Sequence, residues 1–232
     1  MSTRLLTLNP TRSLRKFTAP RYFLAPIHSQ TRSISQSPIA MAPRIIDAIK
    51  EDHREIEDYY NKILSATTDK EKIQWQNQFT WELARHSIGE ELVVYPVFEK
   101  NLPDGKAMAD KDRHEHNTVK KKLKEFQNMK PSDPNFESTL KSLMSDLSEH
   151  IQEEENEDLP KLEDAISTEE SQKLSKSFGR TKMFVPSRSH PAAPDKPPFE
   201  TVAGLMAAPL DHISDLFRSW PHTSGMPNPS TK

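Results

Sequence analysis

The sequence predicts an all-α protein whose middle forms an antiparallel, up-down-up-down four-helix bundle. Three observations support this fold class. Apolar residues from Ile45 to about Ile166 recur at steps of three and four, which places them on one stripe of each helix. Five glycines occur in 232 residues, and no segment shows the alternation typical of a half-buried strand. Short polar connections separate the periodic segments, as they do between antiparallel neighbours.

The first two helices are separated by the polar run 66–69. The apolar stripe of the first helix starts at Ile45. Thr68 and Glu71 form a capping box, S/T-x-x-E, that predicts the beginning of the second helix. Pro96 is expected to kink the end of this second helix, because proline cannot donate a backbone hydrogen bond.

The third and fourth helices complete a bundle predicted over residues 44–167. A Leu-Pro-Asp-Gly turn at 102–105 precedes the third helix. The segment 131–134, Pro-Ser-Asp-Pro, separates the third helix from the fourth. Connections of this length make consecutive helices antiparallel neighbours.

The first 43 residues differ in composition from the bundle. The first acidic residue of the chain is Asp47, whereas the preceding segment is rich in Arg, Ser and Thr. This composition is typical of a mitochondrial transit peptide, and a disordered basic tail is the alternative interpretation. We expect a mitochondrial matrix protein if translation starts at Met1, and a cytoplasmic one if it starts at Met41.

The region 168–232 is predicted to hold a short helix and then a proline-rich tail. Ser167 and Glu170 form a second capping box, and Gly179 is expected to end the helix that follows. Nine prolines after that helix predict a mostly extended or disordered tail.

One segment of the tail, residues 201–218, has the apolar pattern of an amphipathic helix. Its apolar residues are Leu205, Leu210, Ile213, Leu216 and Phe217. We expect an interruption near Pro209. The plainest interpretation is a helix that packs on its own bundle, with a protein partner or a membrane surface as alternatives.

The composition excludes several classes of function. Without any cysteine, the chain has no disulfides, zinc–thiolate sites, iron–sulfur clusters or thiol catalysis, so a metal must be held by imidazole and carboxylate. A net charge of -2 provides no basic field for nucleic acid. No apolar run approaches the ~18 residues that a transmembrane helix needs.

An internal repeat carries the strongest functional signal. The second and fourth helices both read His, Glu at +4, Glu at +5 and Pro at +10, starting from His86 and His150. The first and third helices each place an acid directly before a histidine, in Asp52-His53 and Glu115-His116. The chain therefore reads as two copies of one helical hairpin.

These spacings suit a metal site in the centre of the bundle. Residues four apart on a helix share a face, with about 5–6 Å between their Cβ atoms, so a His and a Glu can reach one ion. Two hairpins bring together four imidazoles and two carboxylates, a set that suits Fe or Mn and admits Zn. A cation also offsets the cost of burying the carboxylates. The candidate ligands are His53, His86, Glu90, His116, His150 and Glu154.

Several neighbouring residues are assigned other roles. His116 continues the apolar stripe of its helix, whereas His114 faces away and is expected at the surface or behind a ligand. Asp112, one turn before His116, is either an extra ligand or a hydrogen-bond partner of a ligand histidine. A solvated face is expected for the lysine cluster 120–124. The acids expected at the surface are Glu91, Glu153, Glu155 and Glu157.

These motifs resemble the hemerythrin-like, or HHE cation-binding, family. The matching segments are Asp52-His53, His86 to Glu91, Glu115-His116 and His150 to Glu155. The resemblance covers roughly half of the chain, and the layout with both extensions resembles fungal members. It implies that the four histidines ligate two irons and that Glu90 and Glu154 bridge them.

The third helix departs from the pattern of the oxygen-carrying hemerythrins. Those proteins have His-x-x-x-His there, whereas this chain has Asp112 and His116. The missing histidine leaves a coordination position for Asp112, water or an exogenous ligand. Sensing, storage, nitric-oxide chemistry and peroxide chemistry therefore stand beside reversible oxygen carriage.

The function expected from the sequence is that of a non-haem di-iron protein, with two Fe per chain, that binds or senses O2, nitric oxide or iron. The alternatives are a di-iron oxidoreductase with peroxide or nitric-oxide chemistry, and a metal-stabilised structural module. Mn and Zn are the less favoured metals. No separate catalytic acid or nucleophile motif is visible, which favours a metal- or gas-binding protein over an enzyme. A protein partner of the tail and the oligomeric state stay open.

Overall fold

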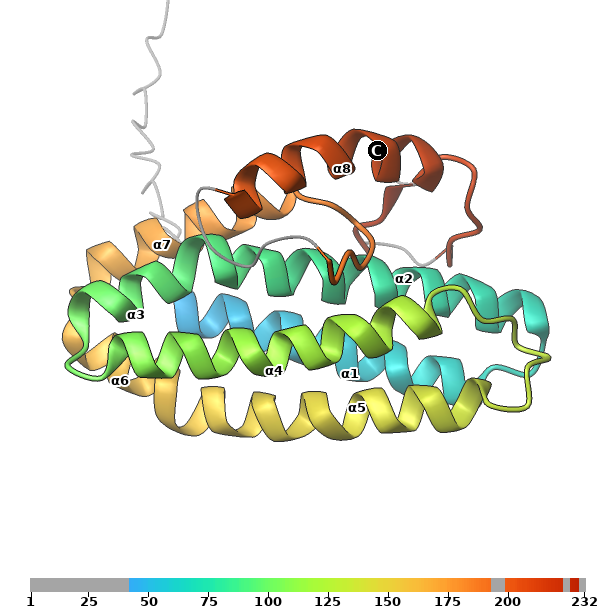
Figure 1. Ribbon diagram of the computed structural model, residues 1–232, viewed down its shortest axis with the longest axis horizontal. Coiled ribbons are helices and arrows are strands. Elements are labelled where there is room, and N and C mark those ends of the chain that lie inside the picture. The colour runs from blue at the N-terminus through green and yellow to red at the C-terminus, as the bar shows by residue number, and fades with distance from the viewer. Residues whose placement is uncertain (1–41, 193–198, 223–225, 230–232) are drawn as a thin grey trace, which may run out of the picture. The chain divides into compact units, whose positions relative to one another are not determined.

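All regular elements of the described residues are helices (Figure 1). The computed structural model describes residues 42–192, 199–222 and 226–229. The transit-like segment predicted at 1–43 lies outside the described residues up to position 41. The elements in chain order are α1 (Ile45–Ser65), α2 (Asp69–Gly89), η1 (Glu90–Val94), α3 (Tyr95–Asn101), α4 (Gly105–Phe126), α5 (Phe136–Glu153), η2 (Glu154–Asp158), α6 (Leu159–Ala165), α7 (Thr168–Lys182) and α8 (Phe199–Asp215).

Four helical columns form the bundle, which confirms the predicted all-α fold. They consist of α1, of α2 with η1 and α3, of α4, and of α5 with η2 and α6 (Figure 1). The Thr68 hydroxyl accepts a hydrogen bond from the Glu71 backbone N–H at 3.2 Å, so the predicted capping box begins α2. None of the described helices has the length and apolar character needed to cross a membrane.

The second and fourth columns each contain one π-helical turn, η1 and η2, at equivalent positions. The N–H of Tyr95 bonds to the carbonyl of Glu90, and the N–H of Leu159 bonds to that of Glu154, five residues back in both cases. A proline follows directly at 96 and 160, and its ring crowds the carbonyl four residues earlier. The column relieves this crowding with a π turn, where the sequence predicted a kink.

Two apolar clusters fill the bundle on either side of a polar centre. One cluster contains Ile56, Phe79, Leu123 and Leu140, among others. The other contains Ile49, Tyr95, Phe98, Ala109 and Leu159, among others. Each column passes from one cluster to the other, and its histidine lies between them. Burial of each large apolar side chain stabilises the fold by roughly 1.5–3 kcal/mol. The two clusters therefore hold the helices in place on both sides of the polar centre.

Gly105 allows α4 to start tightly against the end of α3. A Cβ atom at this position would lie 1.8 Å from the carbonyl oxygen of Phe98, a backbone atom that cannot move aside. We expect Gly105→Ala to lower the free energy of unfolding by about 1–3 kcal/mol, measured by urea denaturation. Gly179→Ala is the matched control, since no atom lies within 4 Å of its Cβ position. Equal losses in the two variants would contradict this explanation.

The helix after the bundle, α7, is longer than predicted. Its N-terminus is capped as expected, because the Ser167 hydroxyl accepts from the Glu170 N–H at 3.2 Å. The prediction that Gly179 ends this helix is wrong, since α7 continues to Lys182. The last turn is held by Phe178, which is buried, and by Lys182, which forms ion pairs with the bundle. Tertiary contacts therefore override the weak helix propensity of glycine.

The amphipathic segment predicted at 201–218 forms α8, but two details of the prediction are wrong. Pro209 lies inside a continuous helix rather than at an interruption. The apolar side chains do not pack on the bundle, because Leu210, Ile213, Leu216 and Phe217 are 58–85% exposed. The side chain of Leu205 lies outside the described side chains. α8 buries its acidic side instead, with Asp211 and Asp215 bonded to residues of the segment after α7.

Candidate metal centre

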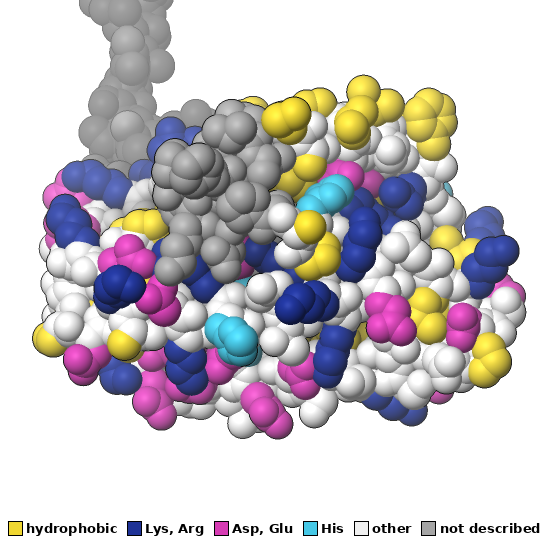
Figure 2. All heavy atoms as spheres, viewed as in Figure 1, with side chains coloured by type: hydrophobic (Ala, Val, Ile, Leu, Met, Phe, Trp, Pro, Cys, Tyr) yellow, Lys and Arg dark blue, Asp and Glu magenta, His cyan; other side chains and the backbone are white. Residues whose placement is uncertain are grey.

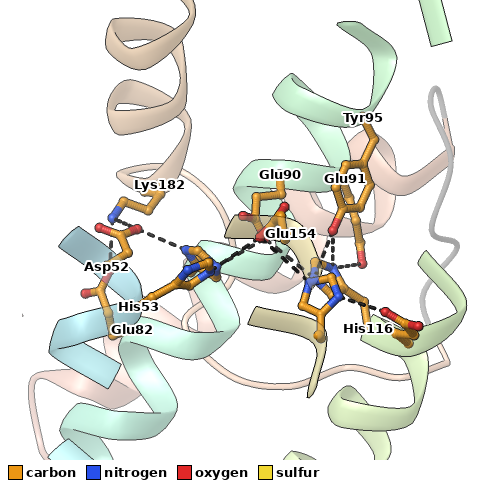
Figure 3. Close-up of polar contacts among 12 residues, drawn as sticks. Asp52, His53, Glu82, Glu90, Glu91, Tyr95, His116, Glu154 and Lys182 are labelled. Atoms are coloured by element: carbon orange, nitrogen blue, oxygen red, sulfur yellow. Dashed lines mark hydrogen bonds and ion pairs between the residues drawn. The ribbon is translucent and has the colours of Figure 1, made fainter. Parts of the chain in front are cut away.

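The six candidate ligands meet inside the bundle, each supplied by one of its four columns (Figure 3). Each is at most 3% exposed. The histidines come from α1, α2, α4 and α5, and the two glutamates are the first residues of η1 and η2. The repeat in the sequence therefore brings equivalent residues together in space. The six are His53, His86, Glu90, His116, His150 and Glu154.

His53 and His86 form one half of the centre, which we call half-site A. Their rings lie edge to face with centroids 4.8 Å apart. The Nε2 atom of His86 is 3.2 Å from Oε2 of Glu90. The Nε2 atom of His53 is 3.4 Å from Oε2 of Glu154. Both imidazoles thus point a nitrogen at a central carboxylate.

His116 and His150 form half-site B with almost the same geometry. Their ring centroids are 4.7 Å apart, and their Nε2 atoms are 3.0 Å apart. The Nε2 atom of His116 is 3.5 Å from Oε2 of Glu90, and that of His150 is 3.9 Å from Oε2 of Glu154. Each central carboxylate therefore faces one histidine of each half-site.

The centre has buried polar atoms without hydrogen-bond partners. Both carboxylate oxygens of Glu90 and of Glu154 lack a partner, as do Nε2 of His53 and Oδ2 of Asp112. A buried polar atom without a hydrogen bond costs roughly 1–3 kcal/mol, and a bound cation removes that cost. Two overlapping groups have their ligand atoms within 4.8 Å of one another, and Glu90 belongs to both groups. These residues therefore fit one or two metal ions bound by nitrogen and oxygen.

Electrostatics also disfavour a fully ionised centre without a cation. Burial and then the charge of Glu154 raise the pKa of Glu90 well above its usual value. Burial opposes ionisation of Glu154 too, but the nearby imidazoles, led by His53, lower its pKa to about 2. Burial and then Glu154 raise the pKa of Asp112 to about 8. Without a cation, Asp112 therefore holds its proton at neutral pH, Glu154 is ionised, and Glu90 ionises less readily than an exposed glutamate.

Within each hairpin, the acid that precedes the histidine of the first helix orients the histidine of the second helix. Nδ1 of His86 is 3.1 Å from Oδ2 of Asp52, and Nδ1 of His150 is 2.9 Å from Oε2 of Glu115. An Nδ1–H that donates to a carboxylate leaves the Nε2 lone pair for the centre. Asp52 and Glu115 thus orient the histidine of the neighbouring helix, not the histidine that follows them in the sequence.

The other two histidines are oriented across the hairpins by the second glutamate of each repeat. Nδ1 of His53 is 2.8 Å from Oε1 of Glu155, and Nδ1 of His116 is 3.1 Å from Oε1 of Glu91. The prediction that these glutamates are surface acids is wrong for Glu91, which is fully buried, and for the Glu155 side chain, which is only 16% exposed. The repeated Glu at +5 was the signal for this role.

The π turns explain why both glutamates of each pair face inward. Successive residues of a π turn are separated by a smaller rotation than in an α-helix. Glu90 and Glu91 therefore both turn toward the bundle at the start of η1. Glu153 is more exposed, and Glu157 lies at the surface.

Each orienting carboxylate is itself paired with a cation. This pairing completes four chains of the form histidine, carboxylate, cation. One of these cations, Lys120, belongs to the cluster 120–124 that is expected to be solvated, but its side chain is only 15% exposed and its ammonium binds Glu91. The pairs are Asp52 with Lys182, Glu115 with Lys111, Glu155 with Arg54 and Glu91 with Lys120.

Two polar residues distinguish half-site B from half-site A. Asp112 is 1% exposed, one turn before His116. The Tyr95 hydroxyl lies 3.0 Å from Nε2 of His116 (Figure 3). The repeat places Ile49 and Leu159 at the equivalent positions of half-site A. The difference between Tyr95 and Leu159 is the signal in the sequence for this asymmetry.

The last turns of α7 close half-site A. The Phe178 ring lies edge-on to His86, with centroids 6.0 Å apart. A Cβ atom at Gly89 would lie 2.8 Å from that ring, so glycine lets α7 approach. The Lys182 ammonium contacts Asp52, and its distance to Oε1 of Glu82 is 3.0 Å (Figure 3). No pattern in the sequence had connected α7 with the centre.

Comparisons with known proteins agree with this geometry. The family model described as Hemerythrin HHE cation binding domain matches residues 44–162. An uncharacterized hemerythrin-like protein of Schizosaccharomyces pombe is 56% identical over 179 residues, which are 77% of this chain and 88% of that protein. A DNA nickase of Nostoc sp. is 25% identical over 145 residues, and the match spans 62% of this chain and 40% of the nickase.

A solved structure shares the fold. It is the crystal structure of a Hemerythrin HHE cation binding domain-containing protein from Mycobacterium kansasii, with a TM-score of 0.53 and 21% identity. The match covers 61% of this chain and 86% of that one. From the matched family model and the identity to the fission yeast protein, the chain belongs to the hemerythrin HHE cation-binding domain family.

Proposed function

We propose that this protein holds a non-haem di-iron centre and uses it to bind or sense O2, nitric oxide or iron. The observation that carries this proposal is the pair of buried carboxylates, Glu90 and Glu154, with no hydrogen-bond partner on any oxygen and a histidine pair on each side. Such an arrangement suits two cations that share two bridging groups. Mixed imidazole and carboxylate ligation favours iron or manganese.

In this proposal the residues divide into holding and orienting groups. His53 and His86 hold one ion, His116 and His150 hold the second, and the two glutamates bridge. The four histidine–carboxylate–cation chains keep each Nε2 lone pair directed inward. A bound di-iron centre supplies a change of oxidation state and a coordination position for a diatomic molecule.

The two ions are inequivalent in this proposal, because half-site B has the extra carboxylate Asp112. An added negative charge there favours the more highly charged form of the ion in half-site B. The Tyr95 hydroxyl lies at the same half-site and can donate a hydrogen bond to a small bound molecule. Asp112 stands where the oxygen-carrying hemerythrins have their additional histidine.

The same hydroxyl favours one alternative, a di-iron oxidoreductase acting on peroxide or nitric oxide. Tyr95 is fully buried, and its pKa is raised by burial and by Glu90, so the hydroxyl keeps its proton. A buried hydroxyl that stays protonated beside a metal ligand is suited to donating a hydrogen bond to a reduced oxygen species. Consumption of peroxide by the iron-loaded protein, measured over many turnovers, separates this alternative from gas binding.

The test is metal analysis of the full chain purified from iron-replete cells. We expect about two irons per chain and oxo-bridge absorption bands that change on exposure to O2 or nitric oxide. The double variant Glu90→Gln/Glu154→Gln is expected to lose most of the metal, since the amides remove both bridging charges. Glu157→Gln, the same change at an exposed position of η2, is the control. One zinc per chain, or no metal after anaerobic iron loading, would contradict the proposal.

A further inference from the structure

α8 is fixed through its acidic side to the segment that follows α7, residues 187–190. Oδ2 of Asp211 accepts a hydrogen bond from the N–H of Arg188 at 3.1 Å and lies 2.9 Å from Nε2 of His190. The indole N–H of Trp220 donates to the carbonyl of Asp215 at 2.8 Å, and both residues are buried. Rotating α8 about its axis would break these contacts and leave the two carboxylates without partners, so the apolar side of the helix stays outward.

The outward side of α8 and the turn after it form one apolar surface, which we call the α8 face. Each of its side chains is 58–85% exposed. All exposed residues between positions 206 and 217 are uncharged. Figure 2 shows hydrophobic side chains gathered along the edge of the molecule over α8. The α8 face consists of Met206, Leu210, Ile213, Leu216 and Phe217.

Three residues of the α8 face have the spacing of a helix-pairing seam. Met206, Leu210 and Ile213 follow steps of four and three within α8, and Leu216 and Phe217 continue the face in the turn after Asp215. A step of four followed by a step of three is the spacing by which two helices pack side by side. A twofold axis across the seam would pair the face with itself, as in most homodimers.

The size of the α8 face also suits a second copy. Its five side chains present roughly 600 Å² of apolar surface, at the upper end for a monomeric protein. A standard specific interface buries about 800 Å² per partner. Met183 and Phe184, which are 51% and 67% exposed, follow at the end of α7 and extend the apolar area. A pocket of about 360 Å³, lined in part by Ile213, Leu216 and Met183, lies beside the face and offers space for a partner side chain.

The charges near the α8 face argue against a membrane surface as its occupant. Helices that lie on membranes carry Lys and Arg on their polar face, which bind anionic lipid headgroups. Among the described side chains of α8, the charged ones are Asp211 and Asp215, and both are turned inward. Arg218 lies 3.2 Å from Asp215 and is neutralised by it.

We propose that the α8 faces of two copies pack against each other and that the protein is a homodimer in solution. This inference does not depend on the metal proposed for the centre. It assigns the tail after the bundle to self-association, and it explains why α8 exposes its apolar side.

The experiment is sedimentation equilibrium and light scattering on the full chain up to about 0.1 mM. The unchanged protein is expected to have the mass of a dimer. The double variant Leu210→Glu/Phe217→Glu is expected to be monomeric, with a dissociation constant raised at least about 100-fold, because it places four like charges in the seam. Circular dichroism checks that the variant stays folded. Ile73→Glu, at an exposed apolar position of α2 outside the α8 face, is the control and is expected to stay dimeric.

Three results would overturn the inference. The first is a monomer at every concentration. The second is a dimer that persists in the double variant. The third is a monomer that floats with vesicles of phosphatidylcholine and cardiolipin and loses this binding in the double variant, which would assign the α8 face to lipid.

Discussion

Replacing Lys182 with methionine is expected to weaken metal binding at half-site A by about 10–100-fold. Lys182 is 14% exposed at its side chain and neutralises Asp52, which accepts the Nδ1 proton of His86. Without the ammonium, Asp52 and Glu82 repel each other and the orientation of His86 is no longer held. Loss of one partner from such a buried set also lowers the free energy of unfolding by about 3–5 kcal/mol.

Two measurements check the Lys182 prediction. One is the rate at which a chelator removes metal from the loaded protein, and the other is urea unfolding of the metal-free protein. Lys173→Met is the matched control, because Lys173 lies on the same helix, is 70% exposed and pairs only with Glu169 among the described residues. If Lys182→Met and Lys173→Met release metal at the same rate, α7 does not support the centre.

The Lys182 prediction concerns a residue outside the part of the chain that the family model covers. That model ends at 162, whereas α7 spans Thr168–Lys182. Phe178 and Lys182 nevertheless contact His86 and Asp52. A truncated protein that ends with the bundle is therefore expected to show the same selective weakening of half-site A.

The metal-free protein is expected to lose about 2 kcal/mol of stability between pH 6.5 and pH 8. The pKa of Asp112 is raised to about 8 by burial and by Glu154, and burial raises that of Glu55 to about 7. The pKa values of His53 and His150 are raised as well, because neighbouring carboxylates outweigh burial. A raised pKa means that the folded state holds protons which the unfolded state has released, so stability falls as the pH rises through that window.

Two shifted groups of the centre oppose this trend only weakly above pH 6.5. The pKa of His116 is lowered to about 4 by burial, and that of His86 is lowered too, but the same histidines in the unfolded chain, with a pKa near 6.5, release their remaining protons just above that pH. Thermal or urea unfolding at pH 6.5, 7.2 and 8 measures the slope. Asp112→Asn is expected to flatten it, and bound metal should remove most of it by displacing the protons. Stability that rises over this window would contradict the assignment.

The helices could be predicted from local patterns because the physical signals are local. Steps of three and four place apolar residues on one side, and Thr68 and Ser167 cap the helices that follow them. The candidate ligands could be chosen for a similar reason. Position i and position i+4 share a helix face, so His86 with Glu90 and the equivalent pair in the fourth helix had to point the same way.

Residues that act on the centre from a distance in sequence could not be found in this way. Glu91 and Glu155 lie one position beyond the ligand stripe, and their inward direction depends on the π turns before Pro96 and Pro160. Lys182 is separated from Asp52 by 130 positions and reaches it only because Gly89 admits Phe178. Hydrogen-bond partners of this kind follow from packing, which no local periodicity encodes.

The sequence by itself determined the helical class, the order of the columns and the twofold repeat of histidine and glutamate. These features depend on rotation per residue along a helix, which is the same wherever the helix lies. The tertiary structure decided which carboxylate and cation hold each histidine, why half-site B is more polar, and which side of α8 meets solvent. The apolar residues of α8 face outward because Asp211 and Asp215 find partners in the segment after α7, and the desolvation of buried carboxylates is tolerated only where such partners exist.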